Sequence, residues 1–162
     1  MKSLCVALTF LFLTSAVALS QTTAQKSFDQ LKTLSGSWEG KASDGKPVQV
    51  SFRDTANGSA LMSEISNHAD MISMFHLDGP DRLMLTHYCS AGNQPRLTAS
   101  ASPDGKTISF DYLDATNLAT PDAGHMQRVV FTIVDANHHI EDWRFSDHGK
   151  EIKQVFDLQR KM

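Results

Sequence analysis

One β-hairpin can be read directly from residues 128–145, RVVFTIVDANHHIEDWRF. Apolar and polar side chains alternate on both sides of a turn at residues 135–137, Asp-Ala-Asn. A period of two places successive side chains on opposite faces, as in a half-buried antiparallel strand. The face that carries the aromatic residues of the second strand also carries Glu141. We therefore expect Glu141 and Trp143 to point into the protein.

The same alternation recurs along most of the chain and predicts about ten short strands, separated by Asn-Gly, Asp-Gly and similar turn sequences. The expected ranges are 36–42, 46–54, 59–67, 70–77, 82–90, 95–101, 106–113, 125–135, 138–146 and 150–159. Such a chain forms a sandwich or a closed barrel, and closure removes the unpaired sheet edges. We predict an all-β fold, a single antiparallel up-and-down barrel. A short helix follows Ser27, and residues 114–124 form a longer connection, a candidate lid.

The first twenty residues have the features of a secretory signal peptide. Lys2 precedes an apolar run that is too short to span a membrane, and small residues follow this run. We expect cleavage after Ser20, a flexible leader over residues 21–26 and a barrel domain over residues 27–162. The mature chain would be periplasmic or extracellular and would contain no membrane span.

The charge of the chain argues against a nucleic-acid partner, and its cysteine content argues against a stabilising disulfide. The chain has a net charge of −3, which gives little support to a nucleic-acid partner because no basic stripe is present. Loss of residues 1–20 would remove one of the two cysteines. Cys89 would then stand alone, so an intramolecular disulfide could not stabilise the fold.

The segment Gly36-Ser37-Trp38-Glu39-Gly40, which follows the expected helix, resembles the Gly-x-Trp start of calycin barrels. This group contains lipocalins, fatty-acid-binding proteins and bacterial lipocalin-like proteins. Residues 85–96, 143–150 and 156–160 also resemble the bacterial group, which is largely of unknown function. The resemblance implies a barrel that binds a small molecule. It also implies that Trp38 crosses the barrel floor against a basic residue from a late strand, a role that Arg160 matches by position.

Polar residues interrupt the apolar pattern mainly between residues 76 and 96. His87 shares a strand face with apolar residues, so we expect it to point inward. Glu64 and His76 would join it if their faces also turn inward, and the three could then transfer protons or bind a metal. A one-residue change of register would reverse these faces. The candidate ligand-binding residues are Glu64, His76, His87, Tyr88, Asn93, Gln94, Arg96, Glu141 and Trp143.

Several functions fit these residues. The one we favour is an exported barrel that holds a small, partly apolar ligand against a polar cluster. The alternatives are an enzyme that uses Glu64, His76 or His87 as general acid or base, and a haem- or metal-binding barrel that uses His76 or His87. A structural envelope protein with a filled core is a further interpretation. The sequence identifies no ligand, cofactor, catalytic residue or oligomeric state, and no common metal-ligand or nucleophile motif is present.

Overall fold

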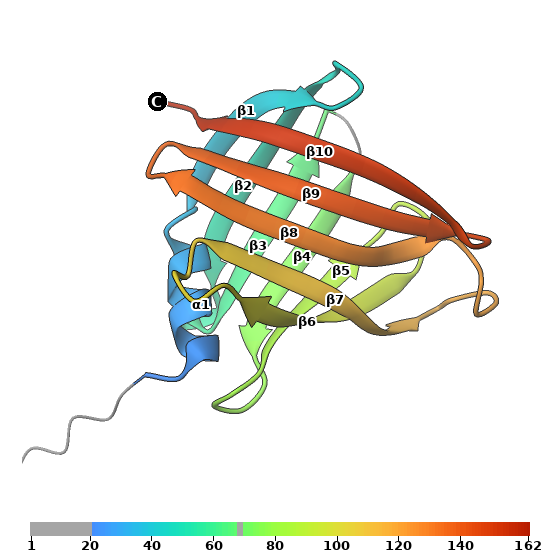
Figure 1. Cartoon of the computed structure of the whole chain (residues 1–162), viewed down its shortest axis with the longest axis horizontal. Helices are drawn as coiled ribbons and strands as arrows, with labels where there is room; N and C mark the ends of the chain where they lie inside the picture. The colour runs from blue at the N-terminus through green and yellow to red at the C-terminus, as the bar shows by residue number, and fades with distance from the viewer. Residues whose placement is uncertain (1–20, 68–69) are drawn as a thin grey trace, which may run out of the picture.

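The computed structural model describes residues 21–67 and 70–162, so the expected signal peptide lies outside the described residues. The described chain forms a closed antiparallel barrel in which each strand pairs with its neighbours in sequence and β1 closes against β10 (Figure 1). The strands are β1 (Gly36–Ala42), β2 (Pro47–Thr55), β3 (Ala60–Ser66), β4 (Met71–Leu77), β5 (Leu83–Tyr88), β6 (Gln94–Ala101), β7 (Thr107–Thr116), β8 (His125–Asp135), β9 (His138–Asp147) and β10 (Lys150–Arg160). The predicted all-β, ten-stranded barrel is therefore confirmed.

The middle of the barrel is filled by aromatic side chains. Phe75 contacts both Phe110 and Phe131 edge to face, with ring centroids 5.4 and 5.6 Å apart. Phe52 approaches Phe131 from the other side at 6.4 Å. Large buried rings of this kind supply much of the apolar area that stabilises a core. Because they occupy the centre, space for a ligand must lie toward an end.

Helix α1 (Thr23–Lys32) lies at one end of the barrel, beside the ends of β2, β4, β5 and β6 (Figure 1). It begins four residues before Ser27, because the Thr22 side chain caps it by accepting a hydrogen bond from the Gln25 amide at 3.2 Å. Residues 23–26, expected in a flexible leader, are thus helical. No described helix is long and apolar enough to cross a membrane.

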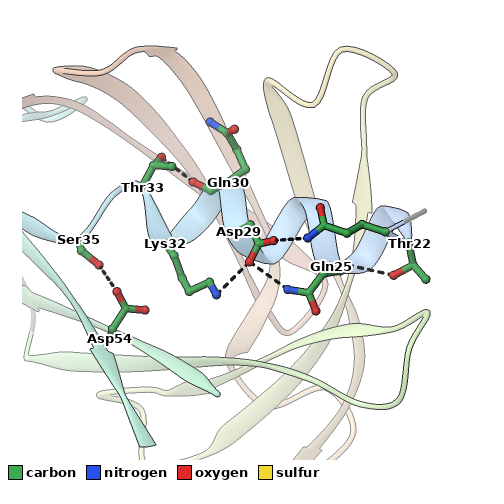
Figure 2. A network of polar contacts seen from close by, with 9 residues as sticks. Thr22, Gln25, Asp29, Gln30, Lys32, Thr33, Ser35 and Asp54 are labelled. Atoms are coloured by element: carbon green, nitrogen blue, oxygen red, sulfur yellow. Dashed lines mark hydrogen bonds and ion pairs between the residues drawn. The ribbon is translucent and has the colours of Figure 1, made fainter. Parts of the chain in front are cut away.

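Polar contacts run along the exposed side of α1, and one further contact just beyond its C-terminal end reaches the sheet (Figure 2). Asp29 accepts a hydrogen bond from Gln25 at 2.9 Å and pairs with Lys32 at 2.9 Å. Beyond the helix, the Ser35 hydroxyl donates to Asp54 of β2 at 3.0 Å (Figure 2). The first two contacts stabilise the helix itself, and the Ser35–Asp54 contact links its C-terminal end to the barrel, while the apolar side of the helix packs on the core.

Trp38 and Arg160 close the floor beneath this helix, as the resemblance implied. The Arg160 guanidinium lies 4.2 Å from the centre of the Trp38 ring. It also donates to the carbonyl oxygens of Ser35 and Thr33, each at 2.8 Å. The Trp38 indole N–H donates to the Leu34 carbonyl at 2.7 Å. The helix end is therefore sealed, and we call the opposite end the open end.

The connection between β7 and β8 lies at the open end, and it is shorter than expected. Residues 114–116 belong to β7, so the loop covers residues 117–124. Asn117 ties the loop to the neighbouring β5–β6 turn by donating a hydrogen bond to the Gly92 carbonyl at 2.6 Å. Residues 114–116 form strand rather than loop because Asp114 and Thr116 pair with Arg96 and Gln94 of β6.

Candidate functional site

His87 is a polar side chain in the barrel interior, on the inward face of β5 that the sequence predicts. It is completely buried. Its Nδ1 lies 2.9 Å from the hydroxyl of Ser73, its direct cross-strand partner on β4. Its Nε2 is buried and has no hydrogen-bond partner among the described residues. Burial lowers the pKa of His87 to about 4, because a charged imidazolium would lose its hydration. The neutral ring therefore presents one unused nitrogen inside the barrel.

Acid is expected to destabilise the protein through this residue. In the unfolded chain His87 regains its ordinary pKa of 6.5, whereas in the folded chain it titrates near 4. Below pH 6.5 the unfolded chain therefore binds the extra proton, and the loss of stability continues until about pH 4. At pH 5 this loss amounts to about 2 kcal/mol. Urea unfolding at pH 7 and pH 5 measures it, and His87→Gln should show a correspondingly smaller difference. An equal pH dependence in both proteins would contradict the assignment.

A second buried polar group lies on β9, where Glu141 and Trp143 point inward as predicted. Glu141 is completely buried and accepts a hydrogen bond from the Trp143 indole N–H at 2.8 Å. Its other carboxylate oxygen lies 3.0 Å from Nε2 of His139, which is also buried. The ring of Trp143 in turn lies 5.2 Å from the ring of His87. Glu141 thus holds an indole that separates it from His87.

The open end contains a pocket of about 420 Å³ beside these residues. Its lining includes the side chains of Met71, Cys89, Met126, Trp143, Ile152, Gln154 and Phe156. The lining is mainly apolar, yet Nε2 of Gln154 is buried without a hydrogen-bond partner among the described residues. A buried amide donor without a partner is costly, so this position favours an acceptor supplied by a bound molecule or water.

Glu64 and His76 do not join His87, and the predicted three-residue cluster is wrong. The inward polar side chains of β3 and β4 are Ser63 and Ser73, which lie directly opposite each other on the two strands. Glu64 is exposed, and His76 is half-buried on the outside of the barrel. The cause is the choice of face, because both strands carry apolar residues on either face. An acid–base or metal site built on Glu64 and His76 is therefore not formed.

The remaining predicted residues lie around the β5–β6 turn and have separate surroundings. Tyr88 is exposed, and Arg96 is an outward residue that donates to Asp114 at 2.6 Å. Gln94 bonds the Gly92 carbonyl within its own turn at 3.2 Å. Asn93 alone is buried, and its Nδ2 donates to the Gly124 carbonyl at 2.8 Å. Only Asn93 of these four lies in a position to face an enclosed ligand.

Cys89 borders the pocket but lacks the features of a nucleophile. Burial raises the pKa of its thiol, which keeps it protonated at neutral pH. His87 already bonds Ser73 through Nδ1. Among the described residues, no group of three or more His, Cys, Asp or Glu side chains could hold a metal ion.

Sequence reasoning missed Ser73, His139 and Gln154. Gln154 shares the alternating face of Ile152 and Phe156, so the sequence predicts that it points inward. The sequence does not predict that its amide lacks a hydrogen-bond partner. Ser73 becomes significant only through His87 on the neighbouring strand β5, which no local pattern shows, whereas His139 bonds Glu141 two residues along the same strand. The pairing of Ser73 with His87 therefore depends on the register between β4 and β5.

Comparison with solved structures supports the barrel architecture. The chain resembles the crystal structure of Rv2717c from M. tuberculosis, with a TM-score of 0.57 and 16% sequence identity. The match covers 84% of this chain and 98% of that chain. At this identity the likeness shows a shared fold alone. No protein-family model and no curated protein matches the chain.

Proposed function

We propose that this protein is an exported, calycin-like barrel that binds a small, largely apolar molecule at its open end. The observation that carries the proposal is the pocket of about 420 Å³ beside Trp143, with the unpartnered amide of Gln154 in its wall. Ligand sites in proteins are typically concave, mostly apolar and equipped with a few polar groups that orient the ligand. Because Trp38 and Arg160 cover the core at the helix end and aromatic rings fill the centre, we infer that a ligand enters the barrel from the open end.

The chemistry of the wall indicates what the ligand must offer. Met71 and Met126 present flexible, polarisable side chains that adapt to irregular apolar shapes. Trp143 lines the pocket with an indole whose N–H is already engaged by Glu141, so it offers a ligand apolar ring surface rather than a hydrogen-bond donor. Gln154 Nε2 requires an acceptor atom. A compact apolar molecule with one carbonyl or similar oxygen satisfies all three.

A dye-binding assay tests this pocket with matched charge substitutions. Ile152 lines the pocket and Leu113 lies on the outside of β7, and each is 48% exposed, so neither substitution should disturb the core. We expect Ile152→Glu to weaken binding of the neutral dye Nile red about tenfold, because a carboxylate would be desolvated against the dye. Leu113→Glu should bind Nile red as the parent does.

Two readouts locate the dye. Its emission should rise and shift to shorter wavelength on binding, and Trp143 fluorescence should be quenched. Trp38, the second of two tryptophans, lies at the sealed end and should respond little. Absence of saturable Nile red binding to the parent, or equal losses in both variants, would overturn the proposal.

A further inference from the structure

We propose that a second pocket at the open end binds a primary ammonium group, so that the ligand is an apolar amine that spans both pockets. This inference rests on the proposed function and specifies its ligand class. The second pocket measures about 300 Å³ and lies under the 117–124 loop. Ala91 and Phe145 line both pockets, which are therefore adjacent. The second one differs in offering hydrogen-bond acceptors.

Asn93 provides the first acceptor. Its side chain is only 4% exposed, and Nδ2 donates to the Gly124 carbonyl at 2.8 Å. A carbonyl oxygen can pair only with the amide nitrogen, so this bond fixes which way the Asn93 amide points. Oδ1 is then left buried with no partner among the described residues. An N–H or O–H donor is what this atom lacks.

Asp147 provides the charge. It is the only charged residue among those described in the lining of the second pocket. Its side chain is about half exposed, and its Oδ1 lies 2.7 Å from Nδ1 of His148, which is largely exposed. A carboxylate beside a neutral unpaired acceptor favours a donor that is also a cation. A carboxylate or phosphate ligand would meet repulsion in the same place.

Phe145 lines both pockets. A Cβ built on Gly124 would lie 2.8 Å from the tip of the Phe145 ring, so glycine allows the ring to rest on the loop. An alkyl or aryl body on one side of this ring and an ammonium group on the other would use both pockets. The distance between them is short, since one ring side chain borders each.

Competition by three eight-carbon molecules against Nile red tests the assignment. Octylamine, octanol and octanoate share one apolar chain and differ in the head group. Asp147 raises the pKa of His148, so measurement at pH 8.5 limits competition from that imidazolium while the amine stays charged. We expect octylamine to bind about fivefold more tightly than octanol, and octanoate to bind most weakly.

Asp147→Asn removes the charge and keeps the shape of the side chain. This variant should bind octylamine and octanol with about equal affinity. Asp157→Asn is the matched control, because Asp157 pairs with His138 at 2.9 Å in the same way on another part of the barrel. The control should keep the parent's preference. Equal affinities of octylamine and octanol for the parent, or an unchanged preference in Asp147→Asn, would overturn the proposal.

Failure of the subsite can be told apart from failure of the apolar pocket. Methylammonium has no apolar body, so it should shift the NMR signals of Gly124 and the Asn93 side-chain amide whether or not Nile red binds. Nile red binding without any preference among head groups would leave the apolar pocket standing and overturn the ammonium site. NMR shifts caused by methylammonium in a protein that does not bind Nile red would support the ammonium site and overturn the apolar pocket.

Discussion

Gly40→Ala is expected to prevent the barrel from closing and to lower the free energy of unfolding by about 4 kcal/mol or more. Gly40 lies in β1 opposite Leu158 of β10, at the junction that joins the two ends of the chain. A Cβ built there would lie 1.8 Å from the carbonyl oxygen of Asp157. The obstacle is backbone that is itself part of the ladder, so no side-chain rotation can relieve it.

Loss of this junction would leave β1 and β10 as unpaired edges, which invite aggregation. Urea unfolding and light scattering measure the two effects. Lys41→Ala is the matched control, because the neighbouring residue is exposed in the same strand and its truncation should change stability by less than about 0.5 kcal/mol. If Gly40→Ala is as stable as Lys41→Ala, β1 and β10 can move apart enough to admit the methyl group while the barrel stays closed, and the prediction is wrong.

The strand pattern could be predicted because it is local. Nearly every predicted strand agrees with the structure within one or two residues at each end, because turns and alternation depend on residues that are close in the sequence. The inward position of His87, Glu141 and Trp143 follows from the same rule. Larger differences arise where tertiary contacts decide, as at β7, which continues into the expected loop because β6 offers it partners.

The choice of face could not be predicted where both faces are apolar. In β4, Ile72 and Met74 lie on one face, whereas Ser73 and Phe75 lie on the other. The sequence pattern favours the face with His76, but Phe75 is wholly buried between Phe110 and Phe131. Packing of one large ring against aromatics from distant strands settles the face, and no single strand contains that information.

Glu141→Leu is expected to lower the free energy of unfolding by about 3 to 5 kcal/mol. The substitution leaves the indole N–H of Trp143 and the ring nitrogen of His139 buried without their acceptor. Each unsatisfied group costs about 1 to 3 kcal/mol, and leucine recovers little because the cavity is shaped for a carboxylate. Urea unfolding at pH 7 measures the loss. Glu141→Gln keeps the volume and an acceptor oxygen for Trp143, so it should lose only about 1 kcal/mol.

Ligand binding distinguishes a positioning role of Glu141 from a purely structural one. Trp143 lines the open-end pocket and contacts His87, so an indole released from Glu141 would change the pocket wall. Measured where each variant is fully folded, Nile red affinity should fall about tenfold in Glu141→Leu and stay near the parent's value in Glu141→Gln. The near-ultraviolet circular dichroism of Trp143 should change in the same order. If Glu141→Leu is unstable yet binds Nile red as tightly as the parent, Glu141 supports the core without orienting Trp143, and the pocket wall must be held by the aromatic contacts of Phe131 and Phe156 instead.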